Sequence, residues 1–165
     1  MSDTPPRLPT PEITIRLITA DDRELWEPLW GAYLEFYQKT VPQTTTDITW
    51  KRLTTPRGAP IGDSGLLEGL LALDERGKAV GMVHFFFHPS TSRPTGSCYI
   101  EDLLVVPSMR GRRVGRRLIT AVVDIAKLKR IGMVYWQTEE FNGPARRLYE
   151  RVAKRSPFIR YQIEL

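Results

Sequence analysis

The chain of 165 residues has 41% hydrophobic and 10% aromatic residues and a formal net charge of +5 at pH 7. This composition excludes a globally disordered chain, because disordered chains contain too few apolar residues to bury a core. The length favours a single domain, and the positive charge favours an anionic partner without identifying it.

The first eleven residues, 1–11, are rich in Pro and Thr and are predicted to be a flexible leader. They lack the basic start and apolar centre of a signal peptide, and no apolar run reaches the roughly 18–20 residues of a membrane span. The single cysteine, Cys98, cannot form an internal disulfide, which is typical of a reducing compartment. We therefore expect a cytoplasmic protein that does not enter a membrane.

The remaining residues, 12–165, are predicted to form one domain, whose strands and helices follow from the spacing of apolar residues. Strands are expected at 12–18, on both sides of a turn at Asp74–Gly77 within 67–88, at 98–106, at 132–138 and at 157–165. Helices are expected from Arg23 to Pro42, at 44–53, from Val114 onward and at 142–154, with a loop over 55–65. This order predicts an α/β (α+β) protein with a mixed central sheet and helices on its faces.

The segment VVPSMRGRRVGRRLI, residues 105–119, joins a predicted strand to a predicted helix through a turn crowded with arginines. The first amides of a helix have no partner within it, and the helix dipole and the guanidinium groups add positive charge there. Glycines in the turn allow the backbone to approach a bound anion closely. The turn therefore predicts a pyrophosphate site. A solvated basic face and a nucleic-acid patch are the alternatives that the arginines alone leave open.

The same segment resembles the acetyl-CoA-binding segment of the GNAT (Gcn5-related) N-acetyltransferases, whose pattern is Arg/Gln-x-x-Gly-x-Gly/Ala. Arg110, Val114 and Gly115 match this pattern. Arg113 stands where the family usually has its first glycine, and this is the one departure in the segment.

A second segment, EEFNGPARRLYERV, resembles the family's Asn-x-x-Ala-x-x-x-Tyr signature, with Asn142, Ala145 and Tyr149 in register. The resemblance extends over 13–165, and it is closest to the Hpa and spermidine/spermine-type branch. It implies the GNAT fold, with about six to seven strands flanked by about four helices. It also implies direct transfer of an acetyl group from acetyl-CoA to a primary amine of a polyamine, an amino acid or a similar small molecule, or of a lysine or peptide.

The resemblance further implies that the pantetheine arm of acetyl-CoA pairs with a strand backbone, while its pyrophosphate binds to amides of the arginine-rich turn. The expected strand residues are Leu103, Leu104 and Val105, the expected turn residues are Arg110, Gly111, Arg112, Arg113, Val114, Gly115 and Arg116, and the far side of the arm is expected at Asn142, Pro144, Ala145 and Tyr149. Either Arg112 or Arg117 would meet the ribose phosphate, and the sequence does not decide between them.

Acetyl transfer needs a base, because an alkylammonium group has a pKa of about 10.4 and must lose its proton before it attacks. Glu101 stands at the position that the resemblance implies for this base, with Asp102 or a water as alternatives. Strand alternation predicts that Glu101 shares a face with Tyr99 and Leu103, while Asp102 lies on the other. The competing interpretation of Glu101 is a structural ion pair with an arginine.

The leaving thiolate needs a proton, and a phenol is a suitable donor. Tyr149 stands at the position that the resemblance implies for this general acid, and the competing interpretation is a tyrosine of the core. Glu35 and Asp47 are candidates for recognising a cationic acceptor, and some aromatic residues of the first helix are candidates for walling its pocket. His84 and His88 lack a third ligand, so no metal site is expected.

The family usually has two strands after its last helix, whereas only 157–165 fits a strand here. A partner subunit is therefore expected to supply the missing strand, in a homodimer with C-terminal strand contacts. Two other classes of function remain as alternatives: a non-catalytic acyl-CoA-binding sensor, and a basic nucleic-acid-binding module. The second is disfavoured, because the arginines cluster at one helix start instead of spreading along a face.

Overall fold

The computed structural model describes residues 12–56 and 67–165. The predicted leader, 1–11, and most of the predicted loop over 55–65 lie outside these residues. None of the helices in the two described stretches is both long and apolar enough to cross a membrane.

The described residues form one five-stranded sheet in the order β1-β2-β3-β4-β5. The strands are β1 (Thr14–Leu17), β2 (Glu68–Leu73), β3 (Ala79–His88), β4 (Ser97–Val105) and β5 (Val134–Tyr135). Neighbours from β1 to β4 are antiparallel, whereas β4 and β5 are parallel. The sheet contains both antiparallel and parallel neighbours, which confirms the predicted mixed sheet. A helix connects the two parallel strands.

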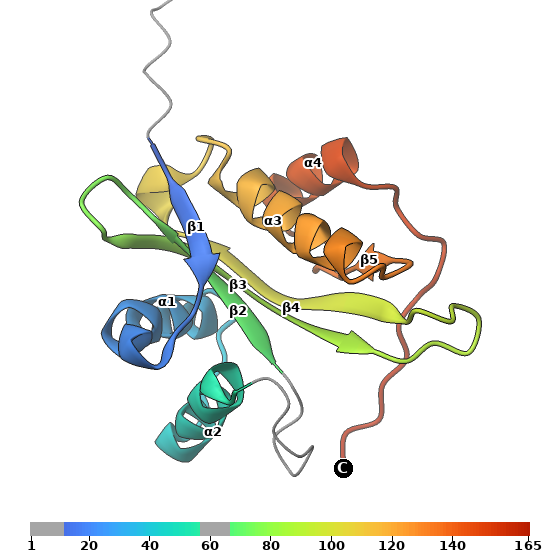
Figure 1. Ribbon diagram of the computed structural model, residues 1–165, viewed down its shortest axis with the longest axis horizontal. Helices are drawn as coiled ribbons and strands as arrows, with labels where there is room; N and C mark the ends of the chain where they lie inside the picture. Colours follow the sequence, from blue (N-terminus) through green and yellow to red (C-terminus); the bar gives the residue numbers. More distant parts are fainter. Residues whose placement is uncertain (1–11, 57–66) are drawn as a thin grey trace, which may run out of the picture.

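Helices cover both faces of the sheet (Figure 1). The first pair is α1 (Arg23–Phe36) and α2 (Gln43–Thr54), and the second pair is α3 (Val114–Leu128) and α4 (Gly143–Val152). Each face has its own core cluster: Trp26 and Met82 belong to the cluster under α1, whereas Phe85 and Leu118 belong to the cluster under α3. The fold is thus the predicted α/β arrangement, built as a sheet between two helical layers.

The predicted C-terminal strand over 157–165 is wrong, and the described residues form a sheet of five strands where six to seven were predicted. This segment leaves α4 and runs along the side of the molecule without joining the sheet (Figure 1). Its alternating apolar residues suit a strand, but a strand needs a neighbour to complete its backbone hydrogen bonds. The β5 strand is also shorter than predicted, with two residues in place of 132–138.

The start of α1 is fixed to β1 by a bidentate ion pair between Arg16 and Asp22, with N–O distances of 2.6 and 2.7 Å. Asp22 also accepts hydrogen bonds from the backbone and the hydroxyl of Thr19. The pKa of Asp22 is lowered to about 2, and the hydrogen bonds from Arg16 are the main cause. This junction sets the direction of α1, whose far end contributes to the site described next.

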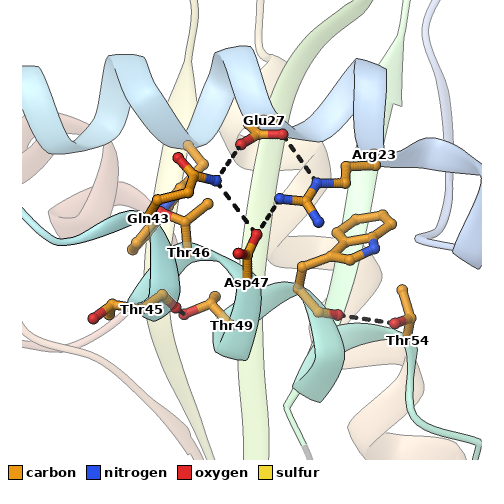
Figure 2. A network of polar contacts seen from close by, with 10 residues as sticks. Arg23, Glu27, Gln43, Thr45, Thr46, Asp47, Thr49 and Thr54 are labelled. Carbon is orange, nitrogen blue, oxygen red and sulfur yellow. Dashed lines mark hydrogen bonds and ion pairs between the residues drawn. The ribbon is translucent and has the colours of Figure 1, made fainter.

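A surface network holds α1 to α2 (Figure 2). Arg23 contacts both Glu27 and Asp47, and Gln43 donates to the same two carboxylates. Asp47 therefore has a structural role between the helices. Neither Asp47 nor Glu35 lines the cavity described below, so the prediction that these two acids recognise a cationic acceptor finds no support in the fold.

Candidate active site

A β-bulge in β4 lies at Glu101. Opposite it, Phe85 pairs with Ile100 and His84 pairs with Asp102, which leaves Glu101 as the extra residue. A bulge shifts the alternation of the strand and re-aims side chains. Ile100 and Leu103 consequently both pack toward the α3 cluster, so the predicted alternation of Tyr99, Glu101 and Leu103 on one face is wrong.

β4 and β5 separate immediately before the bulge. Within the described part of the chain, their ladder holds two residue pairs, Cys98 with Val134 and Tyr99 with Tyr135. Among the residues that the structure describes, β4 continues to Val105 beside β3 alone, so its backbone groups on the β5 side have no ladder partner there from Glu101 onward. An open strand edge of this kind can accept an extended ligand as an added strand.

A cavity of about 470 Å³ lies where the two strands part. Its walls come from the end of α1 and the linker after it, from β4, from α3, from the segment after β5, from α4 and from the C-terminal segment. The lining residues are Tyr33, Tyr37, Lys39, Tyr99, Ile100, Glu101, Leu103, Ile119, Trp136, Gln137, Thr138, Glu139, Glu140, Tyr149, Arg160 and Gln162. Both predicted catalytic residues, Glu101 and Tyr149, are among them.

The Glu101 carboxylate reaches solvent through this cavity, yet the protein around it removes part of its hydration. This burial, followed by the negative charge of Asp102, raises the pKa of Glu101 above its usual value. Lys39, Arg160 and His84 oppose the shift. A carboxylate with a raised pKa is a stronger base than one in water, which suits proton abstraction.

Asp102 takes no part in the cavity wall, because it belongs to a buried polar network under α1. Trp26 Nε1 donates to His84 Nε2 at 2.8 Å, so the imidazole proton must lie on Nδ1, which donates to Asp102 Oδ2 at 2.8 Å. Tyr33 also hydrogen-bonds to Asp102, and His84 is 0% exposed. Of the two adjacent acids, Glu101 is therefore the one with access to a ligand.

Tyr149 projects from α4 into the cavity and packs edge-on against Trp136, with 5.4 Å between ring centroids. Burial, with a smaller contribution from Tyr37, raises the pKa of Tyr149 to about 12. The phenol therefore keeps its proton throughout the neutral range and can donate it to a stronger base formed beside it.

The arginine-rich turn adopts two left-handed residues before α3. Gly111 has φ 74°, and Arg113 has φ 65°. The first α-helical hydrogen bond runs from the Arg117 amide to the Arg113 carbonyl, so the amides of the preceding helical turn have no acceptor within the helix. These amides, with the positive end of the helix dipole, form an arrangement that suits a phosphate group.

We predict that Arg113→Gly stabilises the protein. A side chain in the left-handed region is disfavoured by roughly 1–2 kcal/mol, and glycine removes this strain. Part of the gain is offset by the greater freedom of glycine in the unfolded chain, so we expect a net gain of about 1 kcal/mol, or about 3 °C in Tm. Arg112→Gly is the matched control, since Arg112 has no positive φ and should gain nothing. An unchanged or lower Tm for Arg113→Gly would contradict the prediction.

The arginine side chains of the turn point in different directions. Arg110 Nε donates to the Val105 carbonyl at 3.2 Å, and its guanidinium lies 5.8 Å from the centre of the Phe36 ring. Arg117 donates to the Ile13 carbonyl at 2.5 Å. The Arg117 side chain is thereby held by the residue that precedes β1, which leaves Arg112 as the better candidate for a ribose phosphate.

Other residues of the turn are fixed by packing. Val114 is buried in the α3 cluster, and a Cβ added at Gly115 would lie 3.1 Å from Leu148 of α4. Arg113 and Arg116 line a second, shallow hollow between α3 and β1 instead of the cavity. The backbone amides of this turn are therefore better placed to contact a ligand than its side chains are.

Asn142 is the N-cap of α4, where its Oδ1 accepts from the Ala145 amide at 3.4 Å. Its Nδ2 donates to Thr138 at 3.4 Å, and Tyr37 hydrogen-bonds to both Asn142 and Thr138. The Asn142 side chain thus joins the end of α1 to the start of α4. Pro144, which follows in the first turn, is exposed and suits that position because proline needs no hydrogen-bond acceptor.

The two histidines of β3 have separate structural partners. His84 lies in the buried network, whereas the half-buried His88 contacts the Tyr135 hydroxyl at 2.9 Å. Across the described residues, no group of three or more His, Cys, Asp or Glu side chains is placed to hold a metal ion.

Several cavity residues were not predicted as site residues, including Lys39, Tyr99, Trp136, Arg160 and Gln162. Two of them follow a pattern that is present in the sequence. Arg160 and Gln162 alternate with apolar residues in the C-terminal segment, which places them together on one side of an extended chain. The bulge also has a signal, since two consecutive acids between Ile100 and Leu103 interrupt the strand alternation.

Comparison with known proteins agrees with this geometry. The model of the acetyltransferase (GNAT) family matches residues 24–153. The chain is 30% identical over 162 residues to the D-amino-acid N-acetyltransferase HPA3 of Saccharomyces cerevisiae, covering 98% of this chain and 96% of that protein. It is 28% identical over 143 residues to the uncharacterized N-acetyltransferase YhfO of Bacillus subtilis, covering 84% and 87% of the two chains.

Solved structures share the fold at lower identity. The ribosomal-protein-alanine N-acetyltransferase of Brucella melitensis biovar Abortus is 21% identical, with a TM-score of 0.73 over 93% of this chain and 99% of that one. An aminoglycoside acetyltransferase, AAC(6')-Iy, in complex with a bisubstrate analogue containing CoA, is 18% identical, with a TM-score of 0.71 over 92% and 99% of the two chains.

Proposed function

The chain belongs to the acetyltransferase (GNAT) family and is an N-acetyltransferase that uses acetyl-CoA, and we propose that its acceptor is the primary amine of a small molecule. The observation that carries this proposal is the cavity at the separation of β4 and β5, into which Glu101 and Tyr149 both open. The cavity has walls on many sides, which suits a small acceptor better than the surface of a folded protein.

The residues around this cavity fit acetyl-CoA. The free edge of β4 at Leu103, Leu104 and Val105 would pair with the pantetheine arm, and the amides from Gly111 to Arg116 would hold the pyrophosphate. The Val105 carbonyl already accepts a hydrogen bond from Arg110, so the arm would rely mostly on the two leucines. Asn142 would line the far side of the arm through the backbone of its loop, because its side chain caps α4.

Our proposed mechanism assigns one proton transfer to each catalytic residue. The Glu101 carboxylate takes a proton from the acceptor ammonium, and the free amine then forms a bond to the thioester carbon and releases its second proton to solvent. The carbon–sulfur bond then breaks, and the departing thiolate takes the phenolic proton of Tyr149. Solvent reaches the cavity, so Glu101 can release its proton to it and Tyr149 can regain a proton from it before the next turnover.

A panel of amines assayed for CoA release tests this proposal. The panel would hold polyamines, amino acids, an aminoglycoside and a lysine-containing peptide, with acetyl-CoA hydrolysis as the blank. We expect at least one small amine to be acetylated well above the blank. The name of the yeast relative, a D-amino-acid N-acetyltransferase, supports including both enantiomers of each amino acid.

The same assay separates the alternative functions. Tight binding of acetyl-CoA with no acceptor in the whole panel would favour a non-catalytic sensor. Binding to DNA with a steep salt dependence and no response to CoA would favour a nucleic-acid module. The exposed Arg112 and Arg116 are the side chains on which that last function would depend.

We also propose that the protein is a cytoplasmic homodimer formed through the C-terminal segment. Ile159, Tyr161 and Ile163 lie on one side of this extended segment and are 72%, 86% and 88% exposed. An apolar row beside unpaired backbone groups can pair with its own copy across a two-fold axis. Light scattering should then give about twice the 18.9 kDa of one chain, and Ile163→Asp should return the monomer. The location rests on Cys98, which is a buried free thiol.

A further inference from the structure

The C-terminal segment has two different sides. Arg160 and Gln162 line the cavity, whereas Ile159 and Tyr161 point to solvent. This period of two is the geometry of an extended chain that contributes one of its sides to the cavity wall. The segment thereby brings a guanidinium group from the end of the chain to the site of Glu101, more than fifty residues earlier in the sequence.

A second cation reaches the same cavity from the linker after α1. The Lys39 ammonium lies 5.6 Å from the centre of the Tyr37 ring and lines the cavity. Lys39, Arg160 and His84 all act electrostatically on the Glu101 carboxylate, and of these three Lys39 and Arg160 line the cavity. Neither forms an ion pair with a carboxylate in the described stretches, so both are available to a ligand.

Two further acids line the cavity, and they come from a different segment than Lys39 and Arg160 do. Glu139 and Glu140 lie on the segment that follows β5, and the charge of Glu139 acts on Tyr37. An acceptor whose amine lies at Glu101 would meet the cations Lys39 and Arg160 in the cavity wall, because the negative Asp102 that also acts on Glu101 belongs to the buried network under α1. A second ammonium group there would be repelled, whereas a carboxylate would be attracted and could accept two hydrogen bonds from a guanidinium group.

We propose that Arg160 and Lys39 bind the carboxylate of the acceptor, so that the preferred substrates are free amino acids and not polyamines. This inference rests on the proposed function and names the substrate class of the same cavity. Arg160 determines specificity through its planar pair of donors, and Lys39 adds a point charge from the linker after α1. Neither residue exchanges a proton with the acceptor.

Matched substrate pairs test this proposal. Phenylalanine and 2-phenylethylamine differ by one carboxylate, as do lysine and cadaverine. We expect kcat/KM of the wild-type protein to be about 10- to 100-fold higher for the amino acid of each pair, as is typical of charge-assisted hydrogen bonds. Equal or higher kcat/KM for the decarboxylated amines would overturn the proposal.

Variants of the two cations supply the second test. Arg160→Gln should raise KM for the amino acid about tenfold or more, with little change in kcat, and should leave kcat/KM of the decarboxylated amine unchanged on the plateau above the rising limb of its pH profile. Arg160→Lys should restore part of the affinity, and Lys39→Gln should act in the same direction as Arg160→Gln. Arg155→Gln is the matched control, because Arg155 lies in the same exposed segment and does not line the cavity.

The outcomes separate this inference from the proposed function. Acetylation of amines without preference for a carboxylate, or an equal loss for both members of a pair in Arg160→Gln, would overturn the inference alone. No acetylation of any amine or amino acid would overturn the proposed function and the inference together.

Discussion

Tyr149→Phe should lower kcat about 100-fold, which is the size expected for the loss of a general acid. The thiolate of CoA is costly to leave unprotonated in a site partly shielded from water, and the Tyr149 phenol is the proton donor that faces the cavity from α4. Phenylalanine keeps the ring that packs against Trp136, so the fold and the affinity for acetyl-CoA should change little. Steady-state kinetics, calorimetry with acetyl-CoA and a thermal melt measure these three quantities.

Tyr135→Phe is the control for this experiment. It removes a hydroxyl that contacts His88 and does not line the cavity, so kcat should stay at the wild-type value. A wild-type kcat in Tyr149→Phe would remove this residue from the mechanism. Equal losses of kcat and of acetyl-CoA affinity would assign it a packing role instead.

The sequence predicted the elements whose apolar pattern is strong and whose partners are near in the chain. The helix from Val114 and the hairpin around Asp74–Gly77 are confirmed, because each shows the period of its own structure over many residues. The segment 157–165 has an equally clear alternation and is not a strand. Alternation reports that one side of a segment is apolar, whereas a strand also needs a neighbour that only the tertiary structure supplies.

The site was predictable in part for the same reason. Glu101 and Tyr149 were found from motifs, and both line the cavity. Lys39 and Arg160 carry no motif, since they come from a linker and from the C-terminal segment and meet only in the folded chain. The role of Asn142 as an N-cap could have been read from the proline and alanine that follow it, a composition typical of a first helical turn.

Glu101→Gln should lower kcat/KM at pH 7 about 100-fold and remove the rising limb that the carboxylate contributes to the pH profile. The base acts when ionised, so in the wild-type protein this limb rises as pH passes upward through the pKa of Glu101. Burial and Asp102 raise that pKa, which places the limb above the pH at which an ordinary glutamate titrates. The glutamine variant keeps the shape of the side chain and cannot take the proton.

The defect of Glu101→Gln should shrink as pH rises, because solution then supplies a growing fraction of acceptor with a free amine. Glu150→Gln is the control, since Glu150 is exposed on α4 and pairs with Arg146 outside the cavity. Arg160→Gln gives the complementary measurement with 2-phenylethylamine as acceptor. Arg160 lowers the pKa of Glu101, so its removal should move the wild-type limb to higher pH without abolishing it. A limb that is unchanged in Glu101→Gln would transfer the role of base to water.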